Sequence, residues 1–177
     1  MSSVVWITGL SGAGKSTLAY GIAEKLRIAG KTVVTLDGDE LRKVFEVVEP
    51  NEKNHGREAR LSLAKSYARL CKMISVQDVV VVIATISMFS EIYTWNRANL
   101  PGYFEVYLKI PVEELRRRDP KGIYRRFDAG ELENVAGIDL SIDEPKDSDW
   151  VVEFAPEVSV KKLVEELFNR LSKKSAI

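Results

Sequence analysis

The 177-residue sequence contains only one cysteine and one histidine. A single cysteine, Cys71, excludes an internal disulfide framework and fits a reducing compartment. One cysteine and one histidine, His55, also cannot build a zinc site of the usual Cys/His kind. The scarcity of both residues therefore excludes disulfide-stapled secreted scaffolds and zinc modules.

Neither sign of charge is in excess, since 26 Lys and Arg balance 26 Asp and Glu. A protein that grips nucleic acid non-specifically needs surplus cations, so we expect no nucleic-acid partner. No run approaches the roughly 20 apolar residues that span a bilayer, and the first ten residues lack a basic leader. We therefore expect a cytoplasmic protein that binds no membrane and forms a single domain over residues 1–177.

Short apolar runs alternate with helical patterns along the whole chain. Strands are predicted over 4–8, 31–39, 78–84, 103–110 and 150–154. Helices are predicted between and after them, through Leu18, Ile22 and Leu26 before Gly30, over 38–45, 57–75, 91–99 and 111–118, and through Val160, Val164, Leu167 and Leu171. This alternation predicts a three-layer α/β/α fold with a mainly parallel sheet.

One long segment does not follow this alternation. Residues 119–145 are polar, rich in charge and small residues, and show no clear apolar stripe. A segment of that length inside a compact domain is typically functional or mobile. We expect it to form a mobile lid.

Residues 9–17 read GLSGAGKST, between the first predicted strand and the first predicted helix. They match G-x-x-x-x-G-K-[ST] with Gly9, Gly14, Lys15 and Ser16. The glycines let backbone N–H groups surround an anion, Lys15 can reach the outer phosphates, and Ser16 can ligate Mg²⁺. The pattern predicts a nucleoside triphosphate site made of Gly9, Leu10, Ser11, Gly12, Ala13, Gly14, Lys15, Ser16 and Thr17.

Two further motifs favour phosphate transfer over a nucleotide switch, and no guanine-reading N-K-x-D motif is present. DGDELR follows the second strand, and places Asp37 and Asp39 where ligands bind in open α/β sheets, with Arg42 one turn further on. One carboxylate can hold the Mg²⁺ water shell or accept a hydroxyl proton, the other can orient that hydroxyl, and the arginine can hold an anionic acceptor. In RRRDPKG, Arg118 and Lys121 can neutralise the transferring group while the lid excludes water.

Together, GLSGAGKST, DGDELR, RDPKGIY and GELENVAGID resemble the signatures of the adenylylsulfate kinase family over nearly the whole chain. The resemblance implies a P-loop kinase fold that transfers the γ-phosphate of ATP, with Mg²⁺, to the 3′-hydroxyl of adenosine 5′-phosphosulfate. It implies that Asp37 is the catalytic carboxylate, that Asp39 and Arg42 bind the acceptor, and that Lys121 is a lid residue. We expect Lys15 to be catalytic as well.

The resemblance also extends to parts of two weaker motifs. Arg57 matches the first arginine of D-R-x-E-N, and Ile86 and Ser87 match F-I-S-P, so all three are expected to bind substrate. Dimers are common in the family, which makes a homodimer a further expectation.

The departures from the family pattern all fall on the acceptor side. The D-L-G-F motif is absent from 45–54, Val135 replaces the stacking phenylalanine of F-T-G, and the N-I-R-R helix start is replaced by residues 60–63. TISMFS, residues 85–90, lacks the family's proline and arginine. Aromatic residues that could replace the missing platforms are Phe45, Phe89, Tyr93, Trp95 and Phe127.

These departures leave the acceptor open. The first hypothesis is an adenylylsulfate kinase of sulfate activation, and the alternative is a kinase of another nucleotide-linked acceptor, such as cytidine diphosphoramidate in surface-polysaccharide modification. A different class is a nucleotide-dependent regulatory protein with slow turnover. A nucleic-acid end kinase is disfavoured by the neutral charge.

Overall fold

The computed structural model describes residues 3–45 and 56–174. His55 and nearly all of the segment that stands in place of the D-L-G-F motif, residues 46–54, lie outside this description. The elements in chain order are β1 (Ser3–Thr8), α1 (Lys15–Ile28), β2 (Val33–Asp37), α2 (Gly38–Val44), α3 (Arg57–Ser75), β3 (Val80–Ala84), α4 (Ser90–Asn99), β4 (Phe104–Lys109), α5 (Val112–Arg118), α6 (Ile123–Asp128), β5 (Trp150–Glu153) and α7 (Val160–Lys173).

The five strands form one sheet in the order β2-β3-β1-β4-β5, and every neighbouring pair is parallel. β1 lies at the centre, where Val5 is in register with Val82 of β3 and with Phe104 of β4. Parallel strands need crossover connections, and the chain supplies them as helices. All five strands therefore end at the same edge of the sheet, beside the segments that carry the predicted motifs.

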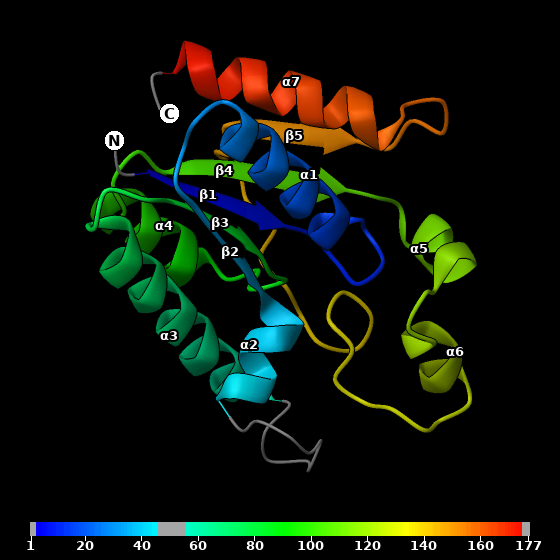
Figure 1. Cartoon of the computed structure of the whole chain (residues 1–177). Coiled ribbons are helices and arrows are strands. Elements are labelled where there is room, and N and C mark those ends of the chain that lie inside the picture. Colours follow the sequence, from blue (N-terminus) through cyan, green and yellow to red (C-terminus); the bar gives the residue numbers. More distant parts are fainter. Residues whose placement is uncertain (1–2, 46–55, 175–177) are drawn as a thin grey trace.

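Helices cover both faces of the sheet, as Figure 1 shows. Alternate residues of β1 point to opposite faces: Val5 and Ile7 belong to the apolar cluster under α1 and α7, whereas Val4 and Trp6 belong to the cluster under α3 and α4. β1, β3 and the first five residues of β4 are buried, as expected for central strands covered on two sides. The predicted three-layer α/β/α fold with a parallel sheet is confirmed.

The predicted lid has more structure than its composition indicated. It contains the helix α6, which was not predicted, and Tyr124 within it is buried. Ile123 and Phe127 pack against the apolar cluster of α1 and α7, as do Leu132, Ile138 and Ile142 further along. The segment therefore does have apolar side chains that face the core, contrary to the expectation from its sequence. The pattern was missed because α6 has only six residues, too few to show a helical period.

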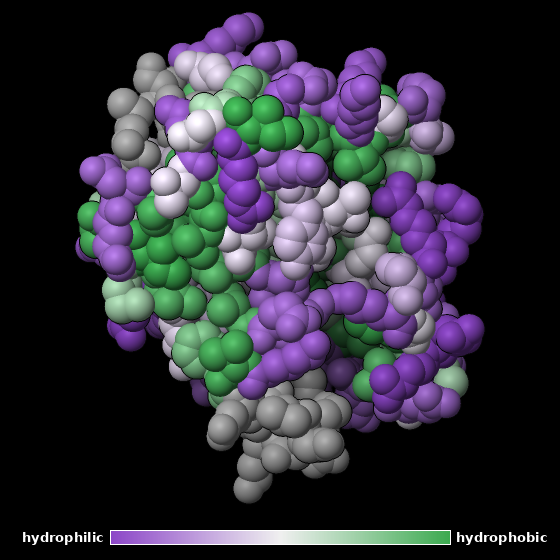
Figure 2. All heavy atoms as spheres, in the orientation of Figure 1, coloured by the Kyte–Doolittle hydropathy of each residue, from purple (hydrophilic) through white to green (hydrophobic). Residues whose placement is uncertain are grey.

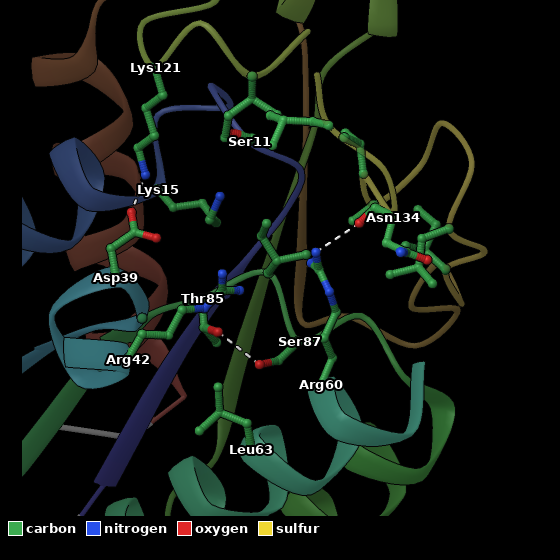
Figure 3. Close-up of a pocket in the computed structure, with 18 of the residues that line it drawn as sticks. Ser11, Lys15, Asp39, Arg42, Arg60, Leu63, Thr85, Ser87, Lys121 and Asn134 are labelled. Atoms are coloured by element: carbon green, nitrogen blue, oxygen red, sulfur yellow. Dashed lines mark hydrogen bonds and ion pairs between the residues drawn. The ribbon is translucent and has the colours of Figure 1, made fainter. Parts of the chain in front are cut away.

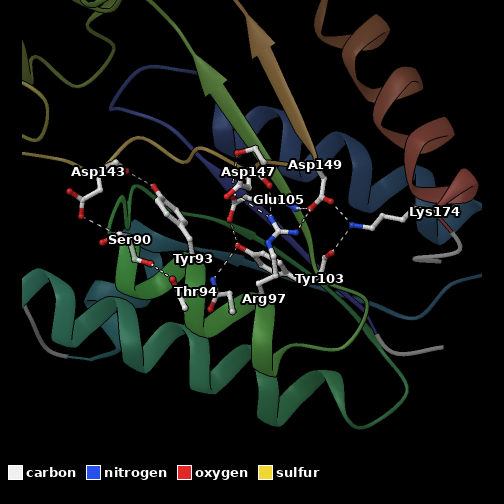
Figure 4. Close-up of polar contacts among 12 residues, drawn as sticks. Ser90, Tyr93, Thr94, Arg97, Tyr103, Glu105, Asp143, Asp147, Asp149 and Lys174 are labelled. Atoms are coloured by element: carbon white, nitrogen blue, oxygen red, sulfur yellow. Dashed lines mark hydrogen bonds and ion pairs between the residues drawn. The ribbon is translucent and has the colours of Figure 1, made fainter.

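Buried polar contacts hold the chain that returns from the lid to β5 (Figure 4). The carboxylate of Glu105 in β4 accepts hydrogen bonds from Tyr103 Oη at 2.6 Å and from Ser148 Oγ at 2.9 Å. Asp149 accepts a hydrogen bond from the Glu105 amide at 2.8 Å and pairs with Lys174 at the end of α7. No helix in the described ranges is both long and apolar enough to cross a membrane.

Candidate active site

A cavity of about 530 Å³ lies where β1, β2 and β3 end. Its walls come from the 9–17 loop, α2, the start of α3, the segment after β3, and the lid. Figure 2 shows a hollow in this region with mostly hydrophilic side chains at its rim, and Figure 3 shows side chains that point into it. The ends of parallel strands are the expected place for a ligand in such a sheet.

The 9–17 loop joins β1 to α1 through three glycines with positive φ, at Gly9, Gly12 and Gly14. A side chain at Gly9 would be strained, because its Cβ would lie 2.8 Å from the carbonyl oxygen of Leu108. Ser11, Lys15 and Ser16 of this loop line the cavity. Leu10 and Ala13 are buried beneath it, so the loop is anchored in the core.

Lys15 is the first residue of α1 and is half-buried in the cavity wall. Its Nζ donates a hydrogen bond to the Leu10 carbonyl at 2.7 Å. Burial, together with the charges of Lys121 and Arg42, lowers the pKa of Lys15 from 10.5 to about 8, while Asp39 and Asp37 oppose this shift. The residue is therefore a cation that gains stability from any added negative charge.

Asp37 links the loop to the end of β2. Its Oδ2 accepts a hydrogen bond from Ser16 Oγ at 2.5 Å, and its Oδ1 accepts one from the Asp39 amide at 2.9 Å. The second bond makes Asp37 the N-cap of α2, which explains why α2 begins at Gly38. One carboxylate thus sets the direction of α2 and lies beside the Ser16 hydroxyl.

Asp39 and Lys121 form an ion pair between α2 and the lid. Burial alone would raise the pKa of Asp39, but the hydrogen bond and charge of Lys121, with Arg42 and Lys15 nearby, lower it below its usual value. Figure 3 shows this pair at one end of the cavity, next to Lys15. The structure therefore brings together Lys15, Ser16, Asp37, Asp39, Arg42 and Lys121, all predicted from the sequence.

The segment after β3 supplies the predicted residues Ile86 and Ser87, and both line the cavity. The Ile86 carbonyl accepts a hydrogen bond from Thr8 Oγ1 at 2.5 Å, and the Ser87 and Thr85 hydroxyls lie 2.7 Å apart. Ser87 has φ 32°, an unusual value for a residue other than glycine. These bonds fix a pair of hydroxyl groups on the cavity floor.

Two lining residues on α3 were missed in the sequence. Arg60 Nη2 donates a hydrogen bond to the Asn134 carbonyl of the lid at 2.7 Å, and Tyr67 Oη donates one to the Gly38 carbonyl at 3.2 Å. Both residues, with Leu63 between them, lie on the α3 face that lines the cavity. Arg60, Leu63 and Tyr67 are three and four residues apart, a spacing that places them on one face of a helix. This spacing does not show whether that face lines a cavity or packs in the core.

The lid contributes an aliphatic wall formed by Leu132, Val135, Ala136, Leu140 and Ile142. Val135 is 7% exposed, and the Asp139 carboxylate accepts hydrogen bonds from the amides of Asn134 and Val135 at 2.8 and 2.6 Å. These bonds hold Asn134 at φ 59°. Position 135 therefore presents a fixed aliphatic side chain to the cavity.

Among the residues that the structure describes, few aromatic rings reach this cavity. Of the five candidate replacements, Phe89 alone is among its lining residues, and Tyr67 is the other aromatic residue there. Tyr93, Trp95 and Phe127 pack against the two apolar clusters. Phe45 is 42% exposed, with its ring 6.0 Å from that of Tyr67.

Arg57 and Arg118, which were predicted to bind ligands, are not among the residues that line the cavity. Arg57 pairs with Asp143 at 2.8 Å and with Glu91 at 3.6 Å. Arg118 donates a hydrogen bond to Glu114 at 2.7 Å, and its guanidinium lies 5.1 Å from the centre of the Phe154 ring. Both side chains therefore have partners within the protein.

Comparison with known proteins identifies the family. The family model described as Adenylylsulphate kinase matches residues 1–153. A cytidine diphosphoramidate kinase from Campylobacter jejuni is 35% identical over 169 residues, which cover 96% of each chain. An adenylyl-sulfate kinase from Pseudomonas aeruginosa is 33% identical over 167 residues, covering 92% of this chain and 83% of the relative.

A solved structure gives the same result. The APS kinase of Mycobacterium tuberculosis, in complex with AMPPNP and APS, superimposes with a TM-score of 0.85 at 28% identity. The match covers 97% of this chain and 98% of that chain.

Proposed function

This chain belongs to the adenylylsulfate kinase family, and we propose that the acceptor of its phosphate is a cytidine-diphosphate-linked compound. The family makes it an ATP-dependent phosphotransferase that acts on a hydroxyl group. The observation that supports this choice of acceptor is the aliphatic wall around Val135, with Phe89 and Tyr67 as the aromatic rings that residues 3–45 and 56–174 bring to the cavity. A base that stacks on an aromatic side chain gains roughly 1–3 kcal/mol. The loss of an aromatic stacking partner therefore weakens the binding of a large purine base more than that of a smaller pyrimidine base.

Adenylylsulfate remains the second candidate, and a different observation favours it. The matching family model and the Pseudomonas relative carry that activity in their names. The proposed cytidine-linked acceptor is supported by the Campylobacter relative, which aligns over 96% of both chains.

The roles of the residues follow from their positions in the cavity. We assign Asp37 as the catalytic carboxylate that accepts the hydroxyl proton, and Lys15 as the cation at the transferring phosphate. Asp39 and Arg42 on α2 are assigned to the acceptor, with Ile86 and Ser87 on the floor. Lys121 brings a lid cation to the same place, and the closed lid excludes water from the transfer. Arg118 stays a prediction for the donor nucleotide and Arg57 for the acceptor.

The site fits a magnesium ion that accompanies ATP. Ser16 Oγ and Asp37 Oδ2 lie 2.5 Å apart in the cavity, and hydroxyl and carboxylate oxygens are the ligand type that Mg²⁺ prefers. We assign Ser16 as the metal ligand. The ion, when bound, neutralises negative charge on the phosphates.

We place this reaction in the cytoplasm, because a sequence with a single cysteine, the buried and unpaired Cys71, suits a reducing compartment. The single domain over 1–177, the homodimer and the absence of nucleic-acid and membrane partners stay predictions.

The test compares cytidine diphosphoramidate and adenylylsulfate as acceptors, with ADP release as the readout. We expect kcat/KM for the cytidine compound to be at least about tenfold higher, which corresponds to one lost stacking contact. A higher value for adenylylsulfate would reverse the assignment. If neither acceptor raises ADP release above the basal rate, the chain is a slow regulatory nucleotide-binding protein instead.

A further inference from the structure

A buried residue of the lid donates a hydrogen bond to the 9–17 loop. Tyr124, on α6, donates from its Oη to the carbonyl oxygen of Ser11 at 2.9 Å. The side chain of Tyr124 is only 1% exposed, and it belongs to the apolar cluster under α1 and α7. Because its neighbours hold the ring in place, the hydroxyl has a fixed position next to the loop.

The start of α6 fixes the backbone of Tyr124 as well. Asp119 Oδ1 accepts a hydrogen bond from the Tyr124 amide at 3.2 Å, and Oδ2 accepts one from the Arg125 amide at 3.0 Å. Burial and the charge of Asp119 raise the pKa of the Tyr124 hydroxyl to about 12, while Arg116 opposes this shift. The hydroxyl therefore stays protonated, and remains a donor, throughout the neutral pH range.

Two further contacts between lid and loop flank this hydrogen bond. A Cβ added at Gly12 would lie 3.4 Å from Pro120 Cδ, so the proline of the lid packs directly on this glycine. A Cβ added at Gly137 would lie 2.8 Å from Leu10 Cδ1, so a second part of the lid packs on the preceding end of the loop. The lid therefore contacts three successive residues of the loop and constrains their conformation.

The hydrogen bond from Tyr124 sets the orientation of the peptide unit between Ser11 and Gly12. Ser11 lines the cavity (Figure 3), whereas Tyr124 is not among the lining residues, so the carbonyl that Tyr124 binds points away from the cavity. The C=O and N–H of a planar trans peptide point in opposite directions. The Gly12 N–H is thereby directed toward the cavity, as a loop that surrounds phosphate with N–H groups requires.

We propose that Tyr124 is a positioning residue for the donor nucleotide, because its hydroxyl holds the Ser11–Gly12 peptide in the phosphate-binding orientation before the nucleotide arrives. Tyr124 acts through this peptide and does not touch the nucleotide. A loop that is already in its binding conformation avoids a loss of affinity, since the apparent Kd rises as the competent fraction of molecules falls. The proposal concerns the nucleoside triphosphate and is independent of which acceptor the chain uses.

The test variant is Tyr124→Phe, which removes the hydroxyl and keeps the buried ring. The matched control is Tyr103→Phe. Tyr103 is also a buried tyrosine that donates a hydrogen bond, to Glu105 Oε2 at 2.6 Å, but it directly precedes β4 and so lies at the opposite edge of the sheet from the cavity. Neither variant changes the net charge at neutral pH.

Four quantities are measured on the full chain, and none of them needs an acceptor. They are the Kd of Mg·AMP-PNP by calorimetry, the Tm, the rate of ADP release at saturating ATP, and the amide resonance of Gly12 in the nitrogen–proton correlation spectrum. Failure of the proposal is therefore distinguishable from a wrong choice of acceptor.

We expect Tyr124→Phe to raise the Kd of Mg·AMP-PNP by roughly three- to tenfold, the change that corresponds to one hydrogen bond. Tyr103→Phe should leave this Kd unchanged, whatever its effect on Tm. The Gly12 resonance of the free protein should shift or broaden in Tyr124→Phe alone, and saturating nucleotide should restore its wild-type position. ADP release at saturating ATP should not change, because the bound phosphates then hold the loop.

Four results overturn the proposal. An unchanged Kd in Tyr124→Phe shows that the hydroxyl does not position the loop. If both variants weaken nucleotide binding in proportion to their loss of Tm, Tyr124 only stabilises the fold. A weaker Kd with an unchanged Gly12 resonance assigns the effect to some other part of the site. Faster ADP release by Tyr124→Phe at saturating ATP shows instead that the hydroxyl keeps the lid closed against water.

Discussion

Binding of a nucleoside triphosphate should be coupled to proton uptake by Lys15. Burial, with the charge of Lys121, lowers the pKa of this amine to about 8 in the empty site. A group with that pKa is neutral in about half of the molecules at pH 8 and in about one-tenth at pH 7. Phosphate oxygens placed beside Nζ favour the ammonium form and raise its pKa. Binding should therefore take up about 0.5 proton at pH 8 and about 0.1 proton at pH 7.

The assay is calorimetric titration of Mg·AMP-PNP in buffers of different ionisation enthalpy, at both pH values. The dependence of the observed enthalpy on the buffer enthalpy gives the number of protons taken up. Lys15→Arg is the matched variant, because a guanidinium stays charged throughout this range and should show uptake near zero. Net proton release at pH 8, equal uptake at the two pH values, or the same uptake in Lys15→Arg would refute the reasoning.

Three further predictions concern other parts of the site. Asp37→Asn should lower kcat at least about a hundredfold with little change in Tm, because the amide oxygen can still cap α2; an unchanged kcat would remove the catalytic role. Val135→Phe should shift the kcat/KM ratio toward adenylylsulfate by about tenfold, and a constant ratio would count against the stacking argument. Gly137→Ala should destabilise by about 1–3 kcal/mol more than Gly130→Ala in denaturant unfolding. Both glycines have positive φ, but only at Gly137 would the new Cβ approach Leu10, at 2.8 Å; equal losses would show that the contact relaxes freely.

The sequence predicted which residues of the 9–17 loop and of the end of β2 lie together, because local patterns determine this part of the cavity. One contiguous motif follows a strand and opens a helix, so the backbone around Gly9 and Gly14 leaves little choice of geometry. Asp37 ends β2 and is in register with Ala84 of β3, and parallel strands in one sheet end at one edge. The fold and the grouping of Lys15 with Asp37 could therefore be predicted without coordinates.

The rest of the cavity, where we propose that the acceptor binds, could not be predicted in the same way, because it combines α2, α3, the segment after β3 and the lid. Arg60 and Tyr67 lie on one face of α3, but sequence spacing does not distinguish a face that lines a cavity from one that packs in a core. The helix α6 was missed for a related reason. Its apolar residues Ile123, Tyr124 and Phe127 span little more than one turn, which is too short for a periodic signal.

Arg57 shows how a residue that matches a family motif can influence a binding site from outside its lining. Its guanidinium pairs with Asp143 and Glu91 and lies 5.0 Å from the centre of the Phe89 ring. The Asp143 carboxylate also accepts a hydrogen bond from the Ser90 amide at 3.0 Å, on the contact surface between the lid end and α4 in Figure 4. Phe89 in turn lines the cavity, so Arg57 contacts both the Phe89 ring and the end of the lid. Because that ring and the lid wall line the cavity, we expect substitution of Arg57 to change acceptor binding even without contact between Arg57 and the acceptor.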